Sequence, residues 1–94
     1  MTMQHVLEFL EKTFREYSFR SGYIGNCGYD GDHRSFRIWC EDVHESDGWG
    51  GTQMLHISLG GQEDIDNRSD NEWILLLMRA CVRIERAAER EVSQ

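Results

Sequence analysis

The chain has 94 residues and a formal net charge of −7, from 17 acidic and 10 basic side chains. A chain of this length forms one domain with one modest core, which excludes a two-domain enzyme. With 39% hydrophobic and 11% aromatic residues, it is too apolar to be disordered. Its acidity argues against direct binding to a nucleic-acid backbone or to an anionic membrane.

The sequence predicts a cytoplasmic protein. No apolar run approaches the length of a membrane span. The N-terminal segment carries Glu8 and Glu11 among its apolar residues, unlike a signal peptide. The chain has three cysteines, Cys27, Cys40 and Cys81. An odd number favours free thiols in a reducing compartment over a disulfide scaffold.

Residues 3–17 are predicted to form an amphipathic helix with Thr2 as its N-cap. Glu8, Glu11, Lys12, Arg15 and Glu16 lie opposite a single apolar stripe. The stripe consists of Met3, Val6, Leu7, Leu10, Phe14 and Tyr17.

Three strands are predicted to follow. Residues 17–29 alternate in polarity but are interrupted by glycines, which indicates a bent or bulged strand, and Asp30-Gly31 is a hairpin signal. Residues 34–40 alternate cleanly, with Phe36, Ile38 and Cys40 on one face and Arg37 and Trp39 on the other. An acidic, glycine-rich loop is expected over 41–51. In the strand expected over 52–59, Leu55, Ile57 and Leu59 face inward and Met54, His56 and Ser58 outward.

A polar segment over 60–71 is expected to lead into a last helix that runs to about Arg90. Ser69-Asp70-Asn71-Glu72 matches a capping box at its start. Its main apolar stripe is predicted to be Trp73, Ile74, Leu77, Cys81, Ile84 and Ala88. The fold class is therefore α+β in the order α-β-β-β-α, a single domain over 1–94 with a three-stranded antiparallel sheet and two helices packed on one face.

The negative charge is concentrated in one part of the sequence. Residues 41–72 hold nine acids and one base, whereas the remaining residues carry a net charge of +1. We interpret the two loops that flank the third strand as an electronegative contact surface for a basic partner. Solvated loops and a cation site are the alternatives, although no calcium-loop pattern is present. Trp49, which lies in the first of these loops, is a candidate contact if it is exposed. It could instead fold back onto the sheet. The predicted contact residues are Glu41, Asp42, Glu45, Asp47, Trp49, Glu63, Asp64 and Asp66.

The last helix suggests a second interface. Its first two turns are apolar all round, and Leu75 and Val82 fall opposite the main stripe, so either the first helix or another chain must cover them. Arginines line one helical face, either as a solvated edge or as a ladder that meets an acidic patch of a twin subunit. The residues of this possible dimer interface are Leu75, Val82, Arg79, Arg83 and Arg86, with Arg90 continuing the arginine face.

No catalytic motif, cofactor or metal site is predicted, and the protein is expected not to be an enzyme. Cys27, His33, Cys40 and His44 have zinc-binding donor types, but their spacing fits none of the usual frameworks. Cys40 and His44 could in principle form a nucleophile and base, but no orienting third group is evident. No phosphate-binding loop is present, because no lysine follows the glycine clusters.

The α-β-β-β-α order is also that of the double-stranded-RNA-binding domain. That family has a lysine-rich start to its last helix, whereas this helix starts Ser69-Asp70-Asn71-Glu72 and the chain has a single lysine, Lys12. RNA binding is therefore rejected.

In size, acidity and element order the chain resembles the small phage-encoded anti-CRISPR proteins. The resemblance covers the whole chain and rests on topology and acidity rather than on a motif. It implies an inhibitor, acting in the cytoplasm of the host cell, that binds a nucleic-acid-handling protein complex and blocks its nucleic-acid site with carboxylates. A homodimeric structural or regulatory domain and a toxin-immunity-type binding protein are the alternatives.

Overall fold

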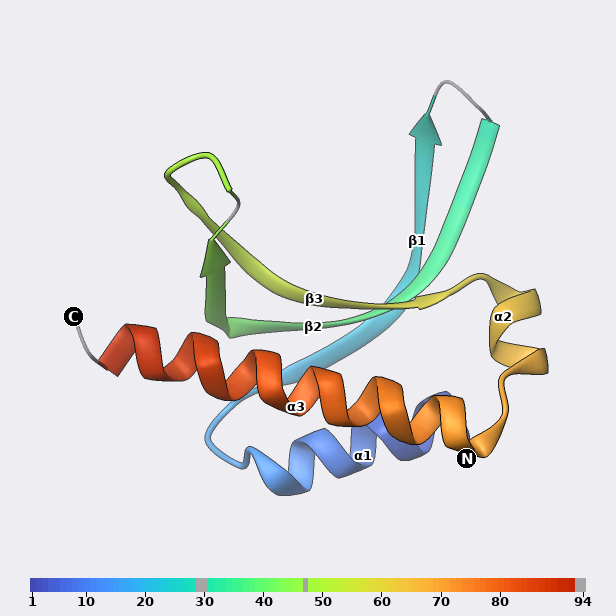
Figure 1. The fold of residues 1–94 in the computed structure, drawn as a ribbon. Coiled ribbons are helices and arrows are strands. Elements are labelled where there is room, and N and C mark those ends of the chain that lie inside the picture. Colours follow the sequence, from blue (N-terminus) through green and yellow to red (C-terminus); the bar gives the residue numbers. More distant parts are fainter. Residues whose placement is uncertain (29–30, 47, 93–94) are drawn as a thin grey trace.

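Six elements follow one another in the computed structural model, which describes residues 1–28, 31–46 and 48–92, and the side chains of these except for 24–28, 31–34 and 90–92. Helices α1 and α3 lie side by side beneath one face of a three-stranded antiparallel sheet, while α2 sits at one end of it (Figure 1). The predicted fold class is therefore confirmed, with one additional short helix. The elements are α1 (Met3–Thr13), β1 (Phe19–Gly28), β2 (Gly31–Ser46), β3 (Thr52–Gly60), α2 (Gln62–Asn67) and α3 (Asp70–Val92).

Helix α1 begins as predicted and ends earlier than predicted. The Thr2 hydroxyl accepts a hydrogen bond from the His5 amide at 3.3 Å, which satisfies one of the free amides of the first turn. The helix ends at Thr13, because Phe14 adopts a non-helical backbone conformation. The Phe14 ring remains buried and stacks on Tyr17, with 6.2 Å between the ring centroids. Phe14 and Tyr17, the last residues of the predicted apolar stripe, therefore pack from the turn that follows α1 and not from the helix itself.

The strand alternation is confirmed on β2 and β3. Ile38 and Cys40 of β2, and Leu55, Ile57 and Leu59 of β3, are buried against the helices. The strand order is β1-β2-β3, so β3 is an edge strand. At the β1–β2 hairpin Gly28 pairs with Gly31, while Asp30 of the predicted turn lies outside the described residues.

The predicted loop over 41–51 is wrong in its first half, because β2 continues to Ser46. A bulge in β2 separates Cys40, which pairs with Leu55, from His44, which pairs with the neighbouring Met54. The extra residues bring Val43 into the core although it lies an odd number of positions after Cys40. This irregular spacing breaks the two-residue period on which the prediction of a strand depends.

Helix α2 was not predicted, since only Ile65 of its six residues is apolar. Gly60, with φ of +84°, turns the chain out of β3, and the Gly61 amide donates to the Asp64 carboxylate at 3.0 Å. Glu63 and Asp64 also lie in the first turn, where negative charge is favourable. The sequence signal for α2 is therefore its N-terminal capping and acidic residues, not an apolar period.

Helix α3 begins with the predicted cap, since the Glu72 amide donates to the Ser69 hydroxyl at 3.2 Å. Its buried face agrees with the prediction at Trp73, Leu77 and Ile84 and differs at the other positions. Ile74 is exposed, and Cys81 and Ala88 are only half-buried. Ala80 and Ala87 are buried, and their small side chains let the helix approach the sheet closely. The buried residues of α3 are Trp73, Leu77, Ala80, Ile84 and Ala87.

Candidate functional site

Two of the predicted acidic contact residues on β2 are held by neighbouring segments. The Asp42 carboxylate accepts a hydrogen bond from the Ser18 amide at 2.7 Å, just before β1. Glu41 lies 3.6 Å from Arg20 of β1, and both side chains are more than half exposed. An exposed ion pair at this distance contributes little to stability, but it partly neutralises Glu41.

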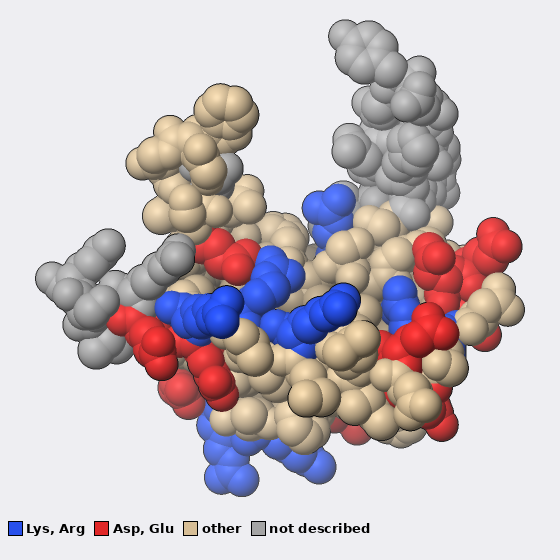
Figure 2. Space-filling model, in the orientation of Figure 1, with Lys and Arg blue, Asp and Glu red and all other residues tan. Residues whose placement is uncertain are grey.

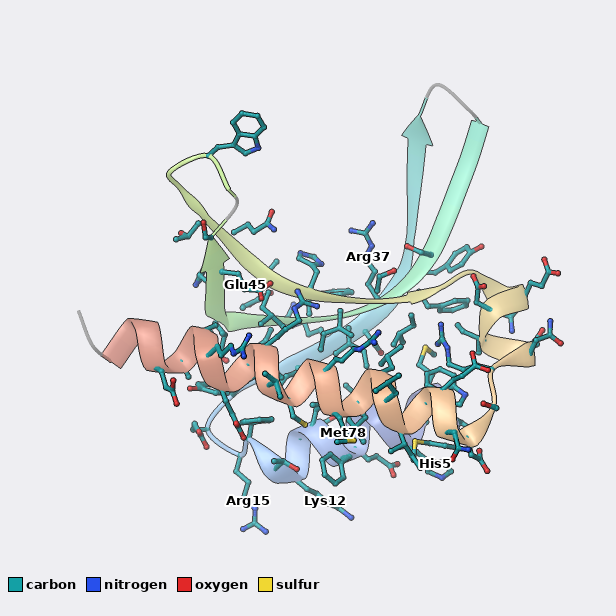
Figure 3. The ribbon with its side chains drawn as sticks, in the orientation of Figure 1. His5, Lys12, Arg15, Arg37, Glu45 and Met78 are labelled. Carbon is teal, nitrogen blue, oxygen red and sulfur yellow. The ribbon has the colours of Figure 1, made fainter. Side chains whose placement is uncertain are left out.

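Glu45 is bound more strongly, by Arg83 of α3. The guanidinium donates from Nη2 to Glu45 Oε1 at 2.6 Å and from Nε to Glu45 Oε2 at 3.2 Å. Figure 3 shows Glu45 beside α3, and its side chain is only 23% exposed. Of the arginines on this face, Arg83 therefore meets an acidic residue of its own chain rather than of a twin subunit. Asp47, the next predicted contact residue, lies outside the described residues.

The acidic residues of α2 and of the start of α3 form an exposed surface that we call the acidic corner. Its carboxylates bind neutral groups, which leave their charge in place: Asp64 binds an amide, Asp66 binds Gln62 Nε2 at 2.7 Å and Glu72 binds the Ser69 hydroxyl at 3.1 Å. Acidic side chains gather over α2 on the face seen in Figure 2. The acidic corner comprises Glu63, Asp64, Asp66 and Glu72.

Two positively charged groups, Arg68 and the Met1 amino group, border the acidic corner. Residues 61–72 contain five acids and one base, Arg68. Within the described residues, no ion pair joins Arg68 to these carboxylates. The fifth acid, Asp70, accepts a hydrogen bond from the Met1 amino group, and this bond and charge lower the pKa of Asp70. The negative charge therefore remains at Glu63, Asp64, Asp66 and Glu72.

Trp49 lies at the opposite end of β3 from the acidic corner. Its side chain is 92% exposed, in a turn that contains the positive-φ residues Gly48 and Gly50. It therefore does not fold back onto the sheet, which was the alternative left open by the sequence. The structure separates it from the acidic corner by the length of β3 (Figure 1).

Helices α1 and α3 expose a continuous apolar surface that we call the apolar ridge. Leu75 and Val82 are about half exposed, so α1 does not cover them, and Met78 is 61% exposed. Figure 3 shows Met78 on the side of α3 that faces away from the sheet. Much of the ridge borders a depression of about 400 Å³ between the two helices. The ridge comprises Phe9, Ile74, Leu75, Met78 and Val82.

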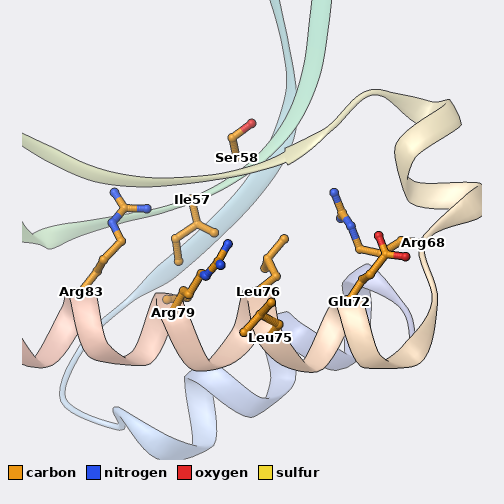
Figure 4. Close-up of a pocket in the computed structure, with 9 residues that line it drawn as sticks. Ile57, Ser58, Arg68, Glu72, Leu75, Leu76, Arg79 and Arg83 are labelled. Carbon is orange, nitrogen blue, oxygen red and sulfur yellow. The ribbon is translucent and has the colours of Figure 1, made fainter.

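A groove of about 470 Å³ runs between β3 and α3, and we call it the edge groove (Figure 4). Ile57 and Ser58 line it from β3, and the apolar part of its floor includes Leu75 and Leu76 of α3. Sequence reasoning missed this site, because its walls come from segments that no local pattern connects. Its charged lining residues are Arg68, Arg79, Arg83 and Glu72.

The outer face of the sheet carries the side chains predicted to face away from the core. Trp39 and His56 stack across β2 and β3 with 6.2 Å between ring centroids, and Arg37 points away from the helices (Figure 3). Gly22 of β1 lies against the Trp39 ring, where an added Cβ would come within 3.1 Å of it. Part of this outer face therefore stabilises the sheet by packing between neighbouring strands.

The described thiols are not exposed as nucleophiles. Cys40 is fully buried in the core, whereas His44 is exposed beyond the bulge. Burial, together with the nearby Glu85 charge, raises the pKa of Cys81 and disfavours its thiolate. Among the described side chains, no three histidine, cysteine or acidic residues form a group that could hold a metal ion. The side chains of Cys27 and His33 lie outside the described residues.

Comparison of the chain with protein-family models, with curated proteins and with solved structures found no match. Of the helices in the part of the chain that the structure describes, none combines the length and apolarity needed to cross a bilayer.

Proposed function

We propose that the protein is a non-enzymatic inhibitor that binds a nucleic-acid-handling protein and covers its basic nucleic-acid site with the acidic corner. In this anti-CRISPR-type mechanism, carboxylates bind the lysines and arginines that otherwise hold phosphates. The partner is the basic protein surface, and the chain does not itself bind nucleic acid.

One observation carries this proposal: the acidic corner keeps its charge exposed, whereas Glu41 and Glu45 of β2 are paired with arginines. Neutral donors bind Asp64, Asp66 and Glu72, but a guanidinium binds Glu45 in a two-point contact. The contact therefore centres on Glu63, Asp64 and Asp66 rather than on Glu45. Trp49, at the far end of β3, is an additional contact only for a partner that spans the whole strand.

The test replaces Glu63 and Asp66 with lysine together, since both are exposed and neither bonds to another element. The partner is first captured from the cells that carry the gene, and its nucleic-acid binding is then measured by mobility shift with the chain added. We expect the wild-type chain to release the nucleic acid. The reversed variant should bind the partner at least about tenfold more weakly and with less salt dependence.

The matched control replaces Glu8 and Glu11 of α1 with lysine, which changes the net charge equally on exposed side chains of another element. This control should release nucleic acid as the wild type does. Equal loss of activity in both variants, or a partner that keeps its nucleic acid while bound, would contradict the proposal. Reversal of Glu45 is a poorer test, because it also breaks the bond to Arg83.

Self-association is a second candidate function, favoured by the apolar ridge. Five large apolar side chains exposed together on adjacent helices are typical of an interface. In a homodimeric regulatory domain, the ridge residues Leu75 and Val82 would meet their copies, with Arg79 and Arg86 at the border and Arg83 held by Glu45.

Light scattering over a dilution series tests this second candidate. We expect a dimer that Met78→Glu converts to a monomer, because the substitution places a charge at the most exposed position of the ridge. Trp49→Glu makes the same kind of change outside the ridge and should leave the mass unaltered. A wild-type monomer at all concentrations rules the dimer out.

A further inference from the structure

We propose that the edge groove binds a short, extended acidic peptide, which adds to β3 as a fourth strand. Its charge preference is opposite to that of the acidic corner, although Glu72 borders both, so it is a second site beyond the function proposed above. Three features support it: an open strand edge, unpaired arginines and an apolar floor.

The open edge is defined by β3 itself. Arg83 Nη2 donates to the His56 carbonyl at 2.8 Å, which shows that this carbonyl points away from β2. Alternate residues of a strand direct their amide and carbonyl groups to the same side, so those of Ser58 also point to the open edge. Adding a strand to such an edge is an established mode of peptide recognition.

The charged groups of the groove select an acidic segment. Arg79 is exposed and has no ion pair or hydrogen bond within the described part of the chain. Arg68 lies over the Trp73 ring at 4.5 Å, and its Nη1 is buried without an acceptor among the described residues. Arg68 also lines the groove, so a ligand carboxylate there would meet its guanidinium from the groove side in a charge-assisted hydrogen bond. Glu72 is the single acid of the lining, against Arg68 and Arg79, because the third arginine, Arg83, is already paired with Glu45.

The dimensions of the groove indicate how much of a bound peptide lies within it. Between Glu72 and Arg83, α3 rises by about 16 Å, which corresponds to about five residues of extended chain. The Arg83 side chain closes one end because it occupies the His56 carbonyl. A peptide lying beside Ser58 would direct alternate side chains toward α3, where Leu75 and Leu76 provide an apolar contact and Arg79 a charged one.

The probe is a fluorescein-labelled heptapeptide with threonine at its odd positions, glutamate at the second and sixth, and leucine at the fourth. Binding is measured by fluorescence anisotropy. We expect saturable binding that Arg79→Glu weakens at least about tenfold. The matched variant Arg86→Glu alters an exposed arginine of the same helix outside the groove and should weaken binding by less than about threefold.

Three further ligands separate strand addition from other modes of binding. A peptide with lysine in place of glutamate should not bind, and N-methylation of alternate backbone amides should abolish binding. No saturable binding of the acidic peptide, or equal effects of the two arginine variants, would overturn the proposal. If N-methylation does not change the affinity and decanoate displaces the peptide, the groove is a site for anionic amphiphiles. That outcome also overturns the proposal.

Discussion

Replacing Trp73 with alanine is expected to lower the free energy of unfolding by about 3–5 kcal/mol, because it removes a large side chain from a well-packed interior. Trp73 is 1% exposed, is the largest fully buried side chain among the described residues and lies beneath the Arg68 guanidinium. A 94-residue domain has a total stability of about 5–14 kcal/mol. In urea unfolding followed by circular dichroism, the midpoint should fall by about 1–5 M.

Trp49→Ala is the control for this substitution. It removes the same side chain from a site where it is 92% exposed, so the free energy of unfolding should change by less than about 0.5 kcal/mol. Equal shifts for the two variants would show that Trp73 is not part of the core that the structure describes.

Gly60→Ala is expected to destabilise the domain by about 2–4 kcal/mol, from backbone strain and a steric clash together. Gly60 has φ of +84°, which side chains with a Cβ rarely adopt, and the added Cβ would lie 2.7 Å from Asp64 Oδ2 and 2.8 Å from Asp64 Cβ. The clash would push Asp64 away from the Gly61 amide and loosen the start of α2. Thermal unfolding should therefore begin at a lower temperature.

Gly48→Ala isolates the contribution of strain. Gly48 has the same φ of +84°, but an added Cβ would meet no atom within 4 Å. We expect this variant to lose about 1–2 kcal/mol, the cost of the left-handed backbone alone. In an Asp64→Gly background, Gly60→Ala should cost less than in the wild type, because all of the clashing side-chain atoms are then absent. Additive losses in that double-mutant cycle would contradict the steric explanation.

The elements that the sequence predicted well are those with regular apolar periodicity. The apolar face of β3 and the buried positions Val6 and Leu10 of α1 follow a period of two or 3.6 residues. The bulge after Cys40 and the nearly apolar-free α2 have no such period, so sequence reasoning placed both in loops. The buried face of α3 was predicted correctly at Trp73, Leu77 and Ile84 but not at Ile74, Cys81 and Ala88. The helix is apolar on several sides, and only packing decides which side faces the sheet.

The candidate site was less predictable than the fold. The sequence located the acidic residues but could not show which of them other side chains neutralise. Glu45 and Arg83 lie 38 positions apart and meet only after the sheet packs on α3. Arg68 and Ser58, which the edge groove brings together, likewise share no local pattern. Tertiary contacts therefore determine which charges remain available to a partner.

The bond between Arg83 and the His56 carbonyl also bears on the behaviour of the protein at high concentration. An edge strand invites intermolecular pairing, by which sheets of separate molecules join and begin to aggregate. Arg83 occupies an acceptor that such pairing needs, and Glu45 holds the guanidinium in place. The pair therefore limits how far a second sheet can extend along β3, and we expect that breaking this ion pair would make intermolecular pairing at the edge easier.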